Sequence, residues 1–79
     1  MAIVRLFASA REAAGTGRTE FAGDTVGDVL DAACQQFGPS FAAVLDVSNV
    51  WLNGDTTSRA AEVSDSDEIA VLPPVSGGV

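Results

Sequence analysis

The fold is decided by the stretch TVGDVLDAACQQFGP, residues 25–39. Thr25 can cap a helix, and Asp28 stands three residues later, as in a capping box. Gly38 supplies a C-terminal stop, and Pro39 prevents continuation. The apolar residues between these signals recur at the spacing of one helix face, namely Val26, Val29, Leu30, Ala33 and Phe37. The pattern predicts an amphipathic helix that ends at Phe37.

Two short runs rich in β-formers precede this helix. Ile3–Ala8 and Arg18–Ala22 are predicted to be strands. The stretch Ser9–Gly17 between them is polar and small, and its end, Gly15-Thr16-Gly17, is typical of a turn. The two strands are therefore expected to form a hairpin.

The second half of the chain alternates between turns and strands. Ser40–Asp46 predicts a short helical turn, and Val47–Asn53 predicts a third strand that the turn at 53–55 closes. Thr56–Asp67 is polar and is expected to be mostly loop, with a short edge strand near Arg59–Ala61. Glu68–Leu72 is a nearly continuous apolar run, the type of strand that is buried on both faces.

The order of these elements predicts an α+β architecture. The first and last strands are the most apolar, so we expect them side by side in the middle of the sheet. This describes the β-grasp (ubiquitin-like) fold, a mixed four- to five-stranded sheet with one main helix packed across it. Residues 1–72 are expected to form this domain. Residues 73–79 are expected to form a flexible C-terminal tail that carries Gly77 and Gly78.

Composition excludes several functional classes. The chain has 79 residues, four arginines, no lysine or histidine, and eleven acidic residues, for a net charge of −7. This surface would repel nucleic acid. One cysteine forms no internal disulfide and no zinc finger, and no apolar run approaches the roughly 20 residues that span a membrane. The N-terminus does not resemble a signal peptide. We expect a soluble, cytoplasmic protein that binds neither nucleic acid nor membrane.

The catalytic inventory is equally short. Without histidine, lysine or tyrosine, most general bases and covalent nucleophiles are missing. Cys34 has no histidine partner and is expected to be a small, partly buried hydrophobe. Asp65, Asp67 and Glu68 match no calcium-loop spacing and are expected to form a solvated turn. We therefore predict no metal site and no bound cofactor.

The sequence resembles the MoaD/ThiS family of ubiquitin-like sulfur carriers, and most closely MoaD, the small subunit of molybdopterin synthase. The resemblance covers essentially the whole chain, and its most specific part is the end, Pro-Pro-x-x-Gly-Gly. The double proline favours MoaD over ThiS. The matching stretches are 6–8, Arg11-Glu12, Gly15, Thr25-Val26, 50–54, 67–72 and 73–78.

The resemblance implies a function for the tail. The carboxylate of Gly78 would be adenylated by a ubiquitin-activating-type, MoeB-like enzyme that uses ATP, and then converted to a thiocarboxylate. The tail would enter a MoaE-like large synthase subunit and deliver sulfur to a pyranopterin precursor. The segment behind the reactive group has to be thin, and glycine has no Cβ. The residues that would bind partners are Pro73, Pro74, Val75, Ser76, Gly77, Phe7 and Arg11.

One residue departs from the family pattern. The family ends at the second glycine, but here Val79 follows Gly78. We expect a protease to remove Val79 before activation. Three alternatives stay open. The sulfur could serve thiamine, cysteine or secondary-metabolite synthesis, the chain could be a protein modifier that forms isopeptide bonds, or it could be a non-catalytic interaction module that Val79 blocks.

Two pairs of residues keep more than one interpretation. Phe7 and Trp51 belong either to the core or to an apolar patch on the sheet face that the helix leaves open. Such a patch would mark a partner surface. Arg11 and Glu12 are either solvated loop charges or, as the resemblance suggests, contacts to a partner.

Overall fold

The computed structural model describes residues 1–74. This part of the chain contains five strands and three helices. In chain order they are β1 (Ala2–Leu6), α1 (Ala8–Ala14), β2 (Arg18–Phe21), α2 (Val26–Phe37), α3 (Pro39–Asp46), β3 (Asn49–Leu52), β4 (Asp55–Thr56) and β5 (Glu68–Leu72). No helix within this range is long and apolar enough to cross a membrane.

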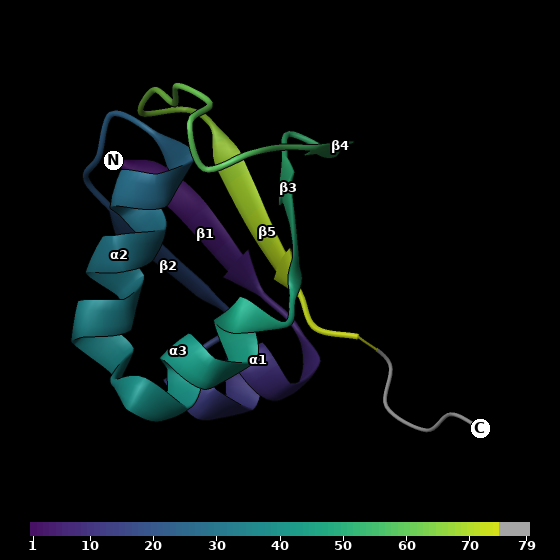
Figure 1. The fold of residues 1–79 in the computed structure, drawn as a ribbon. Helices are drawn as coiled ribbons and strands as arrows, with labels where there is room; N and C mark the ends of the chain where they lie inside the picture. Colours follow the sequence, from purple (N-terminus) through teal and green to yellow (C-terminus); the bar gives the residue numbers. More distant parts are fainter. Residues whose placement is uncertain (75–79) are drawn as a thin grey trace.

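The strands form one mixed sheet in the order β2-β1-β5-β3-β4. β1 and β5 are parallel neighbours at its centre, whereas the pairs β1–β2, β3–β5 and β3–β4 are antiparallel. α2 lies across one face of the sheet, and α1 and α3 lie at the end toward which β1 and β5 run (Figure 1). The prediction of a β-grasp sheet with its first and last strands side by side is confirmed.

The predicted amphipathic helix is confirmed as α2. The Thr25 side chain accepts a hydrogen bond from the Asp28 amide at 3.1 Å, which satisfies one of the free N–H groups of the first turn. Gly38, with φ of 92°, follows the last helical residue, and its amide donates to the Cys34 carbonyl at 2.9 Å. The apolar face of the helix is buried against the sheet, as Val26, Val29, Leu30 and Ala33 show.

The segment after β1 contains a helix where we predicted only a turn. Within Ser9–Gly17, the chain forms α1 up to Ala14, and Gly15 ends it with φ of 78°. Alanine has the highest helix propensity of all residues, and Ala10 is completely buried. β1 and β2 pair as predicted, but a helix joins them, so they are not a simple hairpin.

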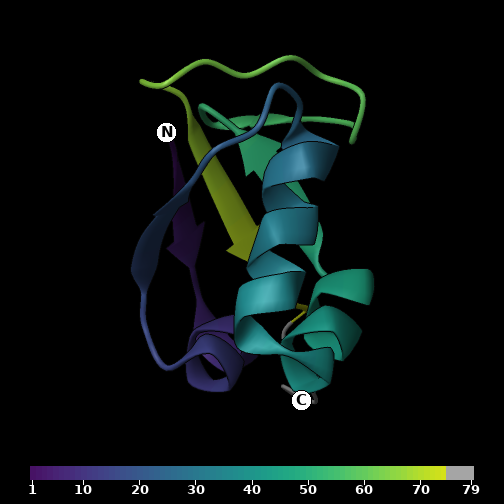
Figure 2. The ribbon, with the colours of Figure 1, turned by 90° about the vertical axis from the view of Figure 1, so that its left-hand side faces the viewer.

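α3 is also longer than the predicted helical turn. Pro39 occupies its first turn, where the missing N–H costs nothing, so the residue that stops α2 also starts α3. Phe41 is fully buried, and its ring lies 5.2 Å from that of Phe37. α2 is the one main helix that lies across the sheet, as predicted, and α1 and α3 are added at the end of the sheet (Figure 2).

The edge strand lies earlier in the chain than predicted. β4 follows β3 directly through a two-residue turn in which Asn53 and Gly54 have φ of 51° and 89°. The Arg59–Ala61 segment, where we expected the edge strand, instead covers the start of α2. The Arg59 and Ala61 carbonyls accept hydrogen bonds, each of 2.9 Å, from the first two amides of that helix.

The prediction that β5 is buried on both faces is wrong. Ile69 and Val71 are fully buried beneath the helices. Glu68, Ala70 and Leu72 point to the other face and are only half-buried. Within residues 1–74, the helices cover only one face of this sheet, and the apolar residues of the other face stay partly exposed.

Candidate docking surface beside the C-terminal segment

β5 delivers the C-terminal segment to one end of the sheet. Its last residue, Leu72, still pairs with β3. Pro73 is half-buried and Pro74 is exposed, and neither residue has an N–H to continue the strand pairing. These two prolines leave the sheet at the end where α1 and α3 lie (Figure 1). The other predicted tail positions, Val75, Ser76, Gly77, Gly78 and Val79, lie outside the described residues.

A shallow apolar hollow opens on the helix-free face of the sheet. Its volume is about 340 Å³, and it is lined by Phe7, Trp51, Gly54, Glu68, Ala70 and Leu72. Trp51 stands opposite Ala70 in the β3–β5 register, so the small alanine leaves space beside the indole ring. Phe7 and Trp51 thus form the surface patch rather than part of the core. We did not single out Ala70 or Leu72 from the sequence, although the alternation along β5 contains that signal.

The local backbone explains why Phe7 is exposed. Phe7 has an extended conformation, with φ of −126° and ψ of 155°, so it continues the alternation of β1 and shares a face with Ile3 and Arg5. The next residue, Ala8, has φ of 50°, a region that is costly for residues with a Cβ. This sharp change turns the chain into α1 and leaves Phe7 41% exposed.

Arg11 and Glu12 lie away from the hollow. Both are exposed residues of α1, and neither lines the hollow. The Arg11 side chain lies close to Gly17. A Cβ placed on that glycine would be 3.4 Å from Arg11 Nε. Arg11 lies one helical turn after Phe7, and its amide donates to the Phe7 carbonyl at 3.3 Å, but the Arg11 side chain is not among those that line the hollow.

Toward β2, the helix-free face carries two exposed ion pairs. Arg5 lies 3.7 Å from Glu68, and Arg18 lies 3.5 Å from Glu20. All four side chains are about half exposed, and exposed ion pairs contribute little to stability. The open face thus has an apolar half near Leu72 and a charged half toward β2.

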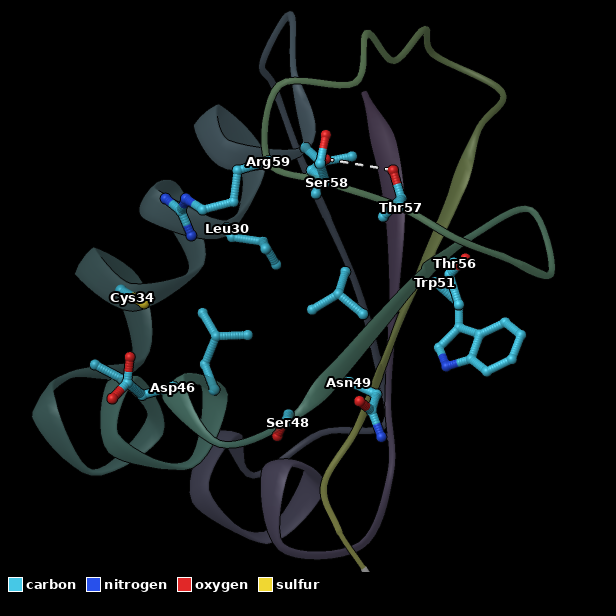
Figure 3. Close-up of a pocket in the computed structure, with 14 residues that line it drawn as sticks. Leu30, Cys34, Asp46, Ser48, Asn49, Trp51, Thr56, Thr57, Ser58 and Arg59 are labelled. Atoms are coloured by element: carbon cyan, nitrogen blue, oxygen red, sulfur yellow. Dashed lines mark hydrogen bonds between the residues drawn. The ribbon is translucent and has the colours of Figure 1, made fainter.

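A larger groove of about 710 Å³ lies on the helix side of β3, between α2, α3 and the segment 56–59 (Figure 3). Apolar side chains such as Leu30 and Val50 line it together with hydroxyl groups from Ser48 and Ser58. The Trp51 indole points away from this groove (Figure 3). No residue in the described range is both buried and polar, so the groove has no buried polar group to orient a small ligand.

Cys34 lines this groove and is half-buried. Burial raises the pKa of the Cys34 thiol above its ordinary value, and the nearby Asp31 carboxylate adds a smaller increase. A raised pKa disfavours the thiolate, which is the nucleophilic form. The side chain packs against the hydrophobic core, as predicted for a small, partly buried hydrophobe.

The three acidic residues at 65, 67 and 68 do not point to a common centre. Asp65 pairs with the N-terminal amine at 2.9 Å, and Glu68 pairs with Arg5. Asp67 accepts hydrogen bonds from the Ser64 amide at 2.7 Å and from the Asn53 side chain at 3.0 Å. Across residues 1–74, no group of three or more histidine, cysteine or acidic residues is placed to hold a metal ion.

Comparisons with known proteins agree with this architecture. A family model described as the ThiS family matches residues 4–78. The chain is 39% identical to small archaeal modifier protein 1 of Haloferax volcanii, over 94% of this chain and 97% of that protein. It is 37% identical to the molybdopterin synthase sulfur carrier subunit of Arabidopsis thaliana, over 95% and 80%. The crystal structure of the Amycolatopsis orientalis BexX/CysO complex contains a chain that matches with a TM-score of 0.83 and 25% identity, over 99% and 100%.

Proposed function

Because this chain belongs to the ThiS family of ubiquitin-like sulfur carriers, we propose that it carries sulfur on the Gly78 carboxylate for molybdopterin synthesis. The carboxylate attacks ATP and releases pyrophosphate, which leaves an acyl adenylate. Hydrosulfide that a partner supplies then attacks the acyl carbon and displaces AMP, which leaves a thiocarboxylate. Its sulfur is transferred to a pyranopterin precursor, and water returns the acyl group to a carboxylate.

The extent of the family match supports Gly78 as the reactive residue. The match runs through Gly77 and Gly78 and stops before Val79. A glycine carboxylate is uncrowded, whereas a valine carboxylate is β-branched. We therefore propose that a protease removes Val79 before activation. Pro73 and Pro74 then direct a thin peptide from the sheet into the partner's site.

The hollow beside Leu72 supports docking of a protein partner. Neighbouring structures include a complex of a CysO-type chain with a second protein. In the proposed cycle, a MoeB-like adenylyltransferase and a MoaE-like large subunit each contact Phe7 and the tail residues, and Arg11 makes a separate contact. These partners supply the catalytic groups, which fits a chain without histidine or lysine.

The intact mass of the protein purified from its native cells tests this proposal. We expect the loss of one valine and, in part of the sample, the replacement of one oxygen by sulfur. Every molecule retaining Val79 in cells that make molybdopterin would contradict activation at Gly78.

The pathway needs a genetic test. Deleting the gene should abolish molybdenum-enzyme activity, and the wild-type gene should restore it, whereas a variant lacking residues 77–79 should not. Loss of thiamine or cysteine synthesis instead would assign the sulfur to another acceptor.

The similarity to a protein named small archaeal modifier protein 1 favours a second candidate function. The same activated Gly78 would acylate lysine amines of other proteins. An epitope-tagged copy should then appear in covalent adducts that resist boiling in detergent and thiol. If the tagged protein runs only at its own mass, the modifier function is contradicted while the carrier function stands.

A further inference from the structure

β2 is an edge strand of the sheet. It pairs with β1 on one side, and the described part of the chain provides no strand on its other side. Figure 2 shows this strand in dark blue at the margin of the fold. An edge strand presents unpaired N–H and C=O groups to any strand that approaches it.

The register identifies which main-chain groups point outward. The Leu6 amide donates to the Gly17 carbonyl at 2.9 Å, so the facing residues Arg5 and Arg18 form a non-hydrogen-bonded pair. Two residues further along, Glu20 has the same orientation. The N–H and C=O groups of Arg18 and Glu20 therefore point away from β1.

The Thr16 side chain occupies part of this edge. Its hydroxyl donates to the Arg18 carbonyl at 3.0 Å and accepts from the Arg18 amide at 3.4 Å. A single hydroxyl thus satisfies both the outward N–H and the outward C=O of Arg18. A neighbouring strand would form its hydrogen bonds with these same two groups. No side-chain hydrogen bond of this kind covers Glu20 in the part of the chain that the structure describes.

The charges on this edge are self-complementary. Arg18, Thr19 and Glu20 are consecutive, and both charged side chains are exposed. If a second copy pairs antiparallel about a two-fold axis through Thr19, each Arg18 faces the Glu20 of the other copy. These are the two residues whose main-chain groups point outward, so one register aligns both the ion pairs and the hydrogen bonds.

We propose that the outer edge of β2 is a strand-addition site for a second copy of this chain. We further propose that the Thr16 hydroxyl blocks this site as long as it is hydrogen-bonded to the main chain of Arg18. Release of Thr16 from Arg18 lets two β2 strands pair into one continuous sheet. The inference is independent of the proposed function. β2 lies at the opposite margin of the sheet from β3 and β4, so the pairing leaves the hollow and Pro74 of both copies accessible.

Sedimentation equilibrium of the full chain tests whether the Thr16 hydroxyl opposes dimerisation. Thr16→Ala removes the hydroxyl, and we expect its dimer dissociation constant to fall on the order of 30-fold, because each of the two copies loses two competing hydrogen bonds. Thr16→Ser keeps the hydroxyl and is expected to match the wild type. The experiment uses about 0.15 M salt, which screens the net repulsion between two acidic chains beyond about 8 Å.

Charge reversal tests the register. In the Thr16→Ala background, Glu20→Arg places arginines opposite each other and should abolish the dimer. Adding Arg18→Glu restores opposite charges and should restore the dimer. Circular dichroism confirms that each variant is folded. Two results would overturn the proposal. One is an equal weight-average mass in solution for Thr16→Ala and Thr16→Ser, and the other is a Thr16→Ala dimer whose dissociation constant is unchanged by Glu20→Arg.

Discussion

Replacing Phe7 by alanine is expected to weaken partner binding and to leave the fold nearly intact. Phe7 is not one of the buried core residues and leaves 41% of its surface exposed. Its main-chain contacts, including the 3.3 Å hydrogen bond from its amide to the Val71 carbonyl, do not depend on the side chain. The other 59% of Phe7 (100 − 41) is already covered within the chain. That is roughly 120 Å², worth at most about 3 kcal/mol at ~25 cal/mol per Å², so we expect the free energy of unfolding to fall by about 1–3 kcal/mol.

The exposed part of the ring gives the magnitude of the binding effect. An aromatic side chain that becomes fully buried covers roughly 200 Å². The 41% that Phe7 still exposes is then roughly 80 Å² of apolar surface that a partner can cover, worth about 2 kcal/mol at ~25 cal/mol per Å². That free energy corresponds to a roughly 30-fold increase in the dissociation constant of the complex with the large synthase subunit.

Phe41→Ala is the matched control for the same chemical change in the core. Phe41 is fully buried, so its truncation should lower the free energy of unfolding by about 3–5 kcal/mol. Urea denaturation followed by the fluorescence of the single tryptophan, Trp51, measures both variants. Isothermal titration calorimetry with the large synthase subunit of the same organism measures binding at a temperature where both variants are folded.

Two results would refute this reasoning. If Phe7→Ala destabilises the fold as much as Phe41→Ala, then Phe7 acts as a core residue and the hollow is not a free surface. If the fold is intact and the dissociation constant is unchanged, then the partner docks elsewhere. Arg11→Ala, outside the hollow, would then be the next variant to measure.

Two further predictions concern stability. Thr25→Ala removes the hydrogen bond that caps α2 and should lower the free energy of unfolding by about 1 kcal/mol in urea denaturation, whereas Thr25→Ser should retain most of it. The Ser64 amide, and next the Asn53 side chain, lower the pKa of Asp67 below its ordinary value of 3.8. Asp67 therefore stabilises the fold fully above that value and loses this contribution as the pH falls through its lower folded-state pKa. Asp67→Asn should flatten the pH dependence of the free energy of unfolding in this acidic range, which urea denaturation at a series of pH values measures.

The sequence was sufficient to predict α2 and the central strands. The helix 26–37 has a capping residue before it, apolar residues at helical spacing within it and a glycine directly after it. Local conformational preference and burial therefore favour the same structure. The bounds of α2 and of β5 were predicted correctly at both ends. β1 and β5 also pair as their apolar composition indicated.

α1 was missed because its burial depends on small residues. Ala10 is fully buried, yet alanine stands out little from its surroundings in a hydropathy pattern, and Ser9 and Gly15 on either side of it favour a turn. The edge strand was misplaced although the sequence contains its signal. We predicted the turn at 53–55, but Asn-Gly is also the residue pair most typical of a two-residue hairpin, in which both residues have positive φ, so it places β4 directly after β3.

The apolar run of β5 shows why the candidate site was harder to predict than the fold. A strand that is buried on both faces in one chain and a strand that keeps one apolar face for a partner have the same composition. The difference here lies in distant residues, because α2 covers only one face and α1 turns the chain away after Phe7. Glu68 and Ala70 alternate with Ile69 and Val71, and a charged residue and a small one on the same face are poor core formers. That alternation distinguishes a half-exposed strand from a doubly buried one, and it places the apolar hollow beside the end of β5 from which the tail departs.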